Sequence, residues 1–206
     1  MNTQLFTNAH IATGMPGSTA AETAAIQDIL VEDGKFISIA PNLKATLEAQ
    51  GKDMASVEVV DLGGKLVCPP FCDTHLHLDY VFTARKPGAV NESGTLFEGI
   101  QRWSETKADL TVDEIKERAK IGIAKEMRHG VQFIRSHADV TDPNLTSLKA
   151  LLELKEELKD TVTLQIVSFP QEGMYSYEGP HGESGADLVE EGLKMGADCV
   201  GGIPHF

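Results

Sequence analysis

Residues 73–79 read Asp-Thr-His-Leu-His-Leu-Asp, and this stretch decides how the rest of the chain is interpreted. Side chains on a β-strand point alternately to opposite faces, so His75 and His77 would share one face, ~6.5–7 Å apart along the strand. Leu76 and Leu78 would then point the other way, into apolar packing. Two imidazoles on one face can bind a single divalent metal ion. The stretch therefore predicts a strand that ends in a metal site.

Strands and helices alternate along the chain after this stretch. Thr111 and Glu114 have the spacing of a capping box, which predicts the start of a helix. Pro143 suits the first turn of another helix. The apolar patterns predict strands over 67–77, 131–137, 162–169 and 199–203, and helices over 111–130, 142–158 and 188–195. Successive βα units of this kind imply parallel strands with right-handed crossovers.

These units indicate an α/β fold, the first half of a (β/α)8 TIM-type barrel. A complete barrel takes ~250 residues. The strand that carries His75 and His77 comes first, and its carboxyl end would lie at the barrel mouth, where such barrels place catalytic groups. A half barrel would expose an apolar strand edge. We therefore expect the functional unit to need more chain than these 206 residues.

The N-terminal region has the pattern of a small β-rich domain. Asp33 and Gly34 stand between two apolar runs and predict the turn of a hairpin. Residues 41–56 could hold a short helix or a loop. We therefore divide the chain into residues 1–65, part of a small composite β-sandwich, and residues 66–206, the first half of the barrel.

The composition is that of an ordinary globular protein with an excess of acidic residues. Eighteen Lys and Arg stand against 31 Asp and Glu, which gives a net charge of −13. That charge would repel nucleic acid and anionic membranes, so neither is an expected partner. No stretch approaches the ~20 apolar residues of a membrane span, and the start lacks the pattern of a signal peptide. The cysteines are therefore expected to be reduced thiols in the cytoplasm.

Several motifs, in the same order, resemble those of one enzyme family. Residues 64–79, GKLVCPPFCDTHLHLD, are similar to the entry motif of the amidohydrolase superfamily. The segments 93–100, 135–140, 164–173 and 196–206 are similar to bacterial cytosine deaminases. The resemblance implies a metal-dependent hydrolase barrel. It also implies that the enzyme deaminates free cytosine, or a close nitrogen heterocycle, to the oxo product and ammonia.

The same resemblance implies roles for single residues. His75 and His77 match the first two ligands of one divalent metal ion, iron or zinc. Gln171 matches the glutamine that hydrogen-bonds the edge of the pyrimidine, and Leu96 matches an apolar residue of the pocket. The remaining ligands and the catalytic acid–base groups are expected beyond Phe206. A metal of this kind lowers the pKa of bound water towards ~7, so that hydroxide can attack the carbon that bears the amine.

The exact substrate stays open at this stage. Residues 80–82, Tyr-Val-Phe, are bulkier and more apolar than the polar stretch that cytosine-specific members often carry there. Isocytosine, creatinine-like rings and triazines are therefore alternative small-molecule substrates. The non-enzymatic alternative is a fragment that only binds a full-length partner. The resemblance also implies a homo-oligomer.

His137 and Asp139 repeat the two-residue spacing on the next strand. They are interpreted either as groups that orient the metal ligands without touching the metal, or as a hydrogen-bonded polar pair at the barrel mouth. Glu172 is interpreted as a structural carboxylate, and Arg102 and Trp103 as packing residues of the loop after the first barrel strand. No function is assigned to the remaining histidines, which are His10, His129, His181 and His205.

Two other interpretations of the motifs compete with this one. Cys68 and Cys72 lie near the histidine pair and could complete a structural zinc site. Zinc fingers, however, space their histidines about three to five residues apart around a turn, whereas these are adjacent on one face of an extended segment. The HxE motif of nucleic-acid deaminases occurs at 181–183, but the PCxxC motif that accompanies it is missing from the sequence.

Overall fold

The computed structural model describes residues 2–11 and 26–204. The chain forms two compact units, Met1–Pro69 and Pro70–Phe206. The division predicted from the sequence lay between residues 65 and 66. Within the described ranges, no helix has the length and apolar character that crossing a membrane demands.

The N-terminal unit is a mixed β-sheet with one short helix. The strands are β1 (Thr3–Ile11), β2 (Ile26–Glu32), β3 (Lys35–Ala40), β4 (Val57–Asp61) and β5 (Leu66–Val67). They lie in the order β3-β2-β1-β4, with β5 also paired to β1; β2 runs antiparallel to both neighbours, while β4 and β5 run parallel to β1. Leu5, Leu30 and Val57 form an apolar core with Leu43 of helix α2 (Leu43–Ala49).

The predicted hairpin is present between β2 and β3. Its turn residues, Asp33 and Gly34, both have positive φ, 49° and 77°. This backbone conformation twists the turn to match the strands, and glycine adopts it without steric cost. The segment predicted as a helix or a loop contains α2 and the 3-10 turn η1 (Met54–Ser56).

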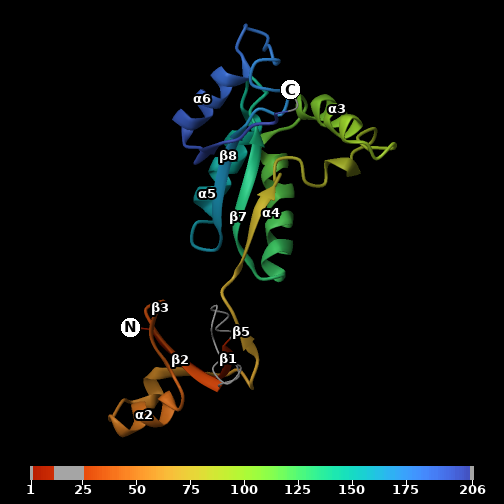
Figure 1. Cartoon of the computed structure of the whole chain (residues 1–206). Helices are drawn as coiled ribbons and strands as arrows, with labels where there is room; N and C mark the ends of the chain where they lie inside the picture. The colour runs from red at the N-terminus through yellow and green to blue at the C-terminus, as the bar shows by residue number, and fades with distance from the viewer. Residues whose placement is uncertain (1, 12–25, 205–206) are drawn as a thin grey trace. The chain divides into compact units, whose positions relative to one another are not determined.

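The C-terminal unit is a parallel sheet with helices, as the sequence predicts for the first half of a barrel (Figure 1). Its strands are β6 (Phe71–Leu76), β7 (Val131–Asp139), β8 (Thr163–Phe169) and β9 (Cys199–Val200), in that spatial order. The helices between them are α4 (Val112–Arg128), α5 (Thr146–Glu157) and α6 (Gly185–Met195). The capping box of Thr111 and Glu114 starts α4 as predicted.

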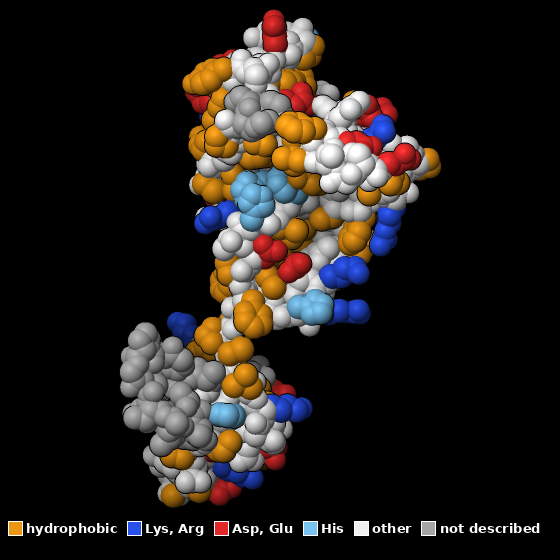
Figure 2. Space-filling model, turned by 45° about the vertical axis from the view of Figure 1, so that its right-hand side comes forward, with side chains coloured by type: hydrophobic (Ala, Val, Ile, Leu, Met, Phe, Trp, Pro, Cys, Tyr) orange, Lys and Arg blue, Asp and Glu red, His pale blue; other side chains and the backbone are white. Residues whose placement is uncertain are grey.

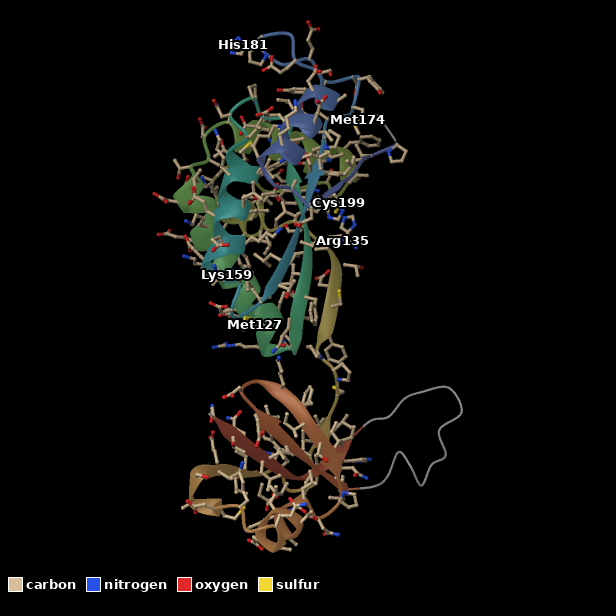
Figure 3. All side chains as sticks on the ribbon, turned by 90° about the vertical axis from the view of Figure 1, so that its left-hand side faces the viewer. Met127, Arg135, Lys159, Met174, His181 and Cys199 are labelled. Carbon is tan, nitrogen blue, oxygen red and sulfur yellow. The ribbon has the colours of Figure 1, made fainter. Side chains whose placement is uncertain are left out.

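The two faces of this sheet differ in their surroundings. Along β7, Ile134 is buried under the helices, whereas Phe133 and Arg135 are exposed. Figure 3 shows α4 and α5 on one side of the sheet and Arg135 on the other. Because β7 alternates in this way, His137 shares the face of Phe133 and Arg135, the face that would line a barrel.

The long segment between β6 and α4 contains a helix that the sequence analysis missed. Residues expected to pack a loop form α3 (Leu96–Lys107), which follows the 3-10 turn η2 (Thr83–Arg85). The side chain of Thr95 caps α3 by accepting from the N–H of Glu98 at 3.4 Å. Leu96, Ile100 and Trp103 have helical spacing along it, so the signal was present in the sequence.

Several predicted boundaries were wrong. Strand β7 continues to Asp139 rather than ending at residue 137, and α6 begins at Gly185 rather than at residue 188. Helix α5 begins at Thr146 rather than at Asp142, because the Asp142 carboxylate accepts from the N–H groups of Asn144 and Thr146 at 3.0 and 2.9 Å and closes a separate turn. Strand β9 ends at Val200 rather than at Ile203. The barrel strand begins at Phe71, because Val67 pairs with β1 in the N-terminal unit.

Candidate functional site

Three histidines meet at the carboxyl end of the parallel sheet. His75 belongs to β6 and His77 follows its last residue, Leu76, which is in register with Ser136 of β7. This register brings His137 alongside the pair. One donor atom from each imidazole lies within 4.8 Å of the other two. Figure 2 shows one group of adjoining histidine side chains that hydrophobic side chains border.

The arrangement fits a divalent metal ion. Two nitrogens that bind one ion at ~2.1 Å can be at most ~4.2 Å apart, only slightly less than the limit observed here. The buried Nδ1 atoms of His77 and His137 lack a hydrogen bond of normal geometry to any described residue. Imidazole nitrogen is a common ligand of both iron and zinc. The residues therefore fit the ion that the sequence predicts, with His137 as a further donor beside His75.

The charge state of the cluster also suits a metal. Burial, followed by the neighbouring rings of His137 and His75, lowers the pKa of His77 to about 4. Burial, followed by the charge of His75, lowers the pKa of His137 as well. Neutral imidazole is the form that binds a metal. At neutral pH these two rings are therefore ready to bind.

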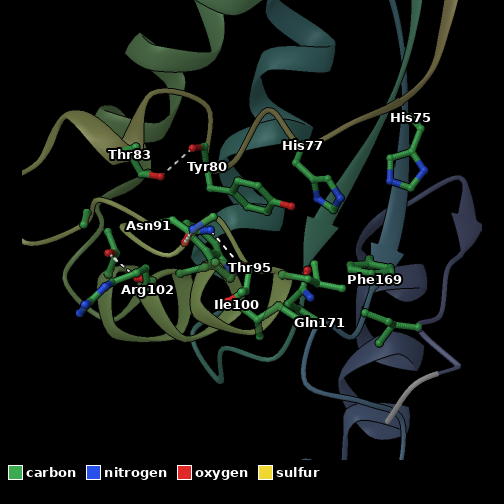
Figure 4. Close-up of a pocket in the computed structure, with 18 of the residues that line it drawn as sticks. His75, His77, Tyr80, Thr83, Asn91, Thr95, Ile100, Arg102, Phe169 and Gln171 are labelled. Atoms are coloured by element: carbon green, nitrogen blue, oxygen red, sulfur yellow. Dashed lines mark hydrogen bonds between the residues drawn. The ribbon is translucent and has the colours of Figure 1, made fainter.

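A cavity of about 690 Å³ opens beside the histidines. Figure 4 shows His77, Tyr80 and Gln171 around it, and α3 forms another part of its wall. Gln171 lies directly after β8 and its Pro170, and its side chain is 6% exposed. Leu96, at the start of α3, also lines the cavity but is 68% exposed. Both predicted substrate contacts thus border the same space as the metal cluster.

Asp139 lies two residues beyond His137, on the same face of β7, and its carboxylate is fully buried. It accepts from Trp103 Nε1 at 2.7 Å and from Lys107 Nζ at 3.0 Å, both on α3. It also accepts from the backbone N–H of Gln171 at 3.3 Å. Asp139 therefore ties α3 and the loop after β8 to the end of β7.

A second carboxylate extends this network. Glu172 accepts from Lys107 Nζ at 2.6 Å and from the hydroxyl of Ser104. The side chain of Lys107, on α3, is 10% exposed. It forms ion pairs with both Asp139 and Glu172 and so links the two acidic groups. The residue next to Gln171 is therefore held by α3, which fixes one side of the cavity relative to the other.

Asp79 is a buried acid that the sequence analysis did not single out. It is fully buried and accepts from the N–H of Asp139 at 2.9 Å and from the N–H of Tyr80 at 3.1 Å. Burial raises its pKa to about 7. Asp79 thus joins the chain after His77 to the end of β7. Asp79 ends the stretch 73–79 that carries the two histidines, which was the only sequence signal for its role. The pattern does not indicate whether Asp73 or Asp79 is buried.

The other histidines and the cysteines lie apart from this cluster. His129 caps the end of α4, His181 lies in the loop before α6, and His10 is in β1; His205 lies outside the described residues. Cys68 and Cys72 are exposed. Of the groups that the structure describes, those placed to hold a metal consist of histidine alone, which argues against the cysteine–histidine zinc site.

The geometry agrees with the match to known proteins. Residues 58–206 match the model of the amidohydrolase family, and the chain belongs to that family. A crystal structure of 5-methylcytosine deaminase from Klebsiella pneumoniae, liganded with 5-fluorocytosine, is similar in structure with a TM-score of 0.79 and 40% identity. That similarity covers 98% of this chain and 43% of the deaminase.

Two curated relatives extend the comparison. The N-isopropylammelide isopropyl amidohydrolase of Pseudomonas sp. (strain ADP) is 30% identical over 187 residues, which are 89% of this chain and 43% of that protein. The pterin deaminase of Rhizobium rhizogenes is 28% identical over 152 residues, which are 71% of this chain and 32% of that protein. This chain therefore spans less than half the length of these relatives.

Proposed function

We propose that the protein deaminates a small nitrogen heterocycle by hydrolysis, with free cytosine or a close analogue as its substrate. The observation that carries the proposal is the cluster of His75, His77 and His137 beside a cavity that Gln171 lines. The 40% identity to a 5-methylcytosine deaminase supports the substrate class. The proposal includes a homo-oligomer that acts in the cytoplasm.

His75 and His77, with His137 as the neighbouring donor, would hold one divalent ion, iron or zinc. Such an ion, when bound, supplies water that is acidic enough to attack near neutral pH. The neutral state of His77, set by its burial, keeps the site ready for the cation. The groups that carry a proton to the leaving amine are proposed to come from the part of the barrel that this chain does not contain.

The cavity walls suit a flat ring with an amide-like edge. The side-chain amide of Gln171 offers both a donor and an acceptor, the pattern that a cytosine-type edge requires. Its backbone is fixed by Asp139, so the amide is presented from a rigid support. A pocket that hydrogen-bonds such an edge rejects rings that lack it far more strongly than an apolar slot does. Tyr80 and Phe169 add aromatic walls.

The test is ammonia release by the full-length protein that contains this chain, loaded with iron or zinc. We expect turnover with cytosine or 5-methylcytosine, and loss of turnover after treatment with a chelator. Isocytosine, creatinine and an aminotriazine serve as competing substrates in the same assay. Preferred turnover of the triazine would replace cytosine by the substrate class of the Pseudomonas relative. Metal-loaded protein that releases ammonia from none of them would contradict the proposal and favour a non-catalytic binding role.

A further inference from the structure

A stack of aromatic rings runs from the metal cluster to helix α3. Tyr80 stacks on His77 with ring centroids 4.5 Å apart and an angle of 21° between the planes. The other neighbour of Tyr80 is Trp103, with a centroid distance of 4.7 Å. Figure 4 shows the Tyr80 ring reaching toward His77 across the cavity wall. The ring of Tyr80 is therefore enclosed between a candidate metal ligand and a helix residue.

Trp103 and Tyr80 in this stack are each held by hydrogen bonds. Trp103 is 6% exposed and donates from Nε1 to the buried carboxylate of Asp139 at 2.7 Å. The backbone N–H of Tyr80 donates to Asp79 at 3.1 Å, and its carbonyl accepts from the hydroxyl of Thr83 at 2.8 Å. A ring that is fixed through its backbone and through its neighbour cannot tilt freely. Its flat face therefore restricts the ring it covers.

His77 needs such a restraint. Metal-binding histidines are usually oriented by a hydrogen bond from the nitrogen that does not bind the metal. The buried Nδ1 of His77 lacks such a bond of normal geometry among the described residues, so the plane of the ring depends on packing, whichever nitrogen binds the metal. Tyr80 makes the closest of the ring contacts to His77, at 4.5 Å between centroids, compared with 5.3 Å for His75 and His137 and 5.5 Å for Phe169.

We propose that Tyr80 is a positioning residue that sets the plane of His77 for metal binding, and that Trp103 holds Tyr80 in place through Asp139. The inference rests on the proposed metal site. Under this proposal, helix α3, which forms a wall of the cavity, controls the orientation of the metal ligand His77 through the packed rings of Trp103 and Tyr80.

The test measures Zn²⁺ affinity of the 206-residue chain by competition with a chromophoric chelator. Tyr80→Phe keeps the ring and should bind Zn²⁺ within about twofold of the unchanged chain, whereas Tyr80→Leu should bind about 10- to 100-fold more weakly, the range for losing a group that orients a ligand. Tyr175→Leu is the matched control, because Tyr175 is 88% exposed. Far-UV circular dichroism checks that each variant is folded.

A second variant keeps the test decisive if Tyr80→Leu does not fold. Trp103→Phe keeps an aromatic ring but removes the hydrogen bond to Asp139, so we expect weaker Zn²⁺ binding and a changed visible spectrum of the Co²⁺-loaded chain. Zn²⁺ binding and Co²⁺ spectra that stay the same in the folded variants would overturn the inference and leave the metal site standing. A chain that binds no Zn²⁺ before any substitution would overturn the inference, whereas the ammonia assay on the full-length protein tests the proposed function separately.

Discussion

The imidazoles of His75, His77 and His137 come from two neighbouring strands and converge on one point. Burial holds the pKa of His77 at about 4 and lowers that of His137, so neither ring competes for protons near neutral pH. A cation that enters this cluster displaces no proton from these two groups. The side chains of His77 and His137 are thus in the protonation state that could hold a metal ion.

The residue that best tests the metal site is His75. We expect His75→Ala to lower the metal bound per chain and to abolish deamination by the full-length protein, because one of the donors is lost. Metal content is measured by mass spectrometry after gel filtration, and His129→Ala, at the exposed end of α4, is the control. Unchanged metal content and rate in His75→Ala would remove it from the ligand set.

Gln171 is the proposed substrate contact, and substituting it tests substrate binding apart from metal binding. We expect Gln171→Ala to lower kcat/KM for cytosine by about 10- to 100-fold, because a lost hydrogen bond leaves ring atoms unpaired, worth about 1–3 kcal/mol. Metal content should stay at the level of the unchanged protein, since the amide lies outside the histidine cluster. An unaltered kinetic profile would show that Gln171 does not touch the substrate.

The residue patterns predicted the histidine pair but not its surroundings. His75 and His77 follow from spacing along a single strand. The place of His137 beside them depends on the register between β6 and β7, which is a non-local pairing that no local pattern encodes. The same holds for Trp103, whose bond to Asp139 joins residues 36 positions apart in the sequence.

Helix α3 is the element that shapes the cavity, and its two ends are held differently. Its carboxyl half is tied by Trp103 and Lys107 to the buried Asp139. Its amino end is held by Glu98, which accepts from the N–H groups of Glu92 and Ser93 at 3.1 and 2.7 Å. One anchor is a buried ionic network and the other is a hydrogen-bonded loop at the surface.

The buried anchor makes a stability prediction. Asp139→Ala leaves Lys107 and Trp103 without their shared acceptor, and breaking a buried ion pair costs about 3–5 kcal/mol in the free energy of unfolding. Urea denaturation measures the change. Lys159→Ala, which removes an exposed ion pair with Glu156, should cost no more than about 1 kcal/mol. A loss of similar size in both variants would contradict the anchoring role of Asp139.

The surface anchor makes a pH prediction. Hydrogen bonds from Ser93, followed by the N–H of Glu92, lower the pKa of Glu98 to about 2, whereas an unfolded glutamate titrates near ~4.3. The stabilisation from Glu98 is thus fully present above ~4.3 and is lost as the pH falls towards 2. Hydrogen exchange of the Ser93 amide should accelerate over this window, relative to Glu98→Gln. If the exchange rate of the Ser93 amide depends on pH in the same way in the unchanged protein and in Glu98→Gln, the anchoring role of Glu98 is contradicted.

The sequence contained more information on this element than its interpretation used. Thr95 and Glu98 form a recognisable helix start, and the apolar residues from Leu96 onward follow helical spacing. Pro143, by contrast, suggested a helix start that Asp142 prevents by closing its own turn. Competing uses of one carboxylate, as a cap or as a turn, are decided by the packing around it.

At the scale of the whole molecule, the C-terminal unit is a parallel sheet with open ends. Among the described residues, β6 pairs only with β7, and β9 pairs only with β8. Parallel sheets in complete barrels are covered on both faces, but here Phe71, Phe133 and Val200 remain exposed. The alternation of strands and helices was predictable from the periodicity of apolar residues. Which residues cover the open face cannot be predicted from a local sequence pattern.

This openness predicts the behaviour of the isolated chain. We expect the 206-residue polypeptide to be inactive in the ammonia assay and to self-associate with rising concentration, because unpaired strand edges and apolar side chains favour association. Sedimentation velocity over a range of concentrations measures the association. A monomer that turns over cytosine by itself would show that this unit needs no further strands.

The insertion of α3 between β6 and α4 has an evolutionary consequence. The strands that carry the histidines and the segment around α3 that lines the cavity are separate stretches of one polypeptide, so changes within residues 91–102 are expected to alter the proposed ring preference without changing the histidines. A transplanted segment must still place an indole at position 103. A library that randomises this segment should therefore recover new preferences mostly among clones that keep Trp103.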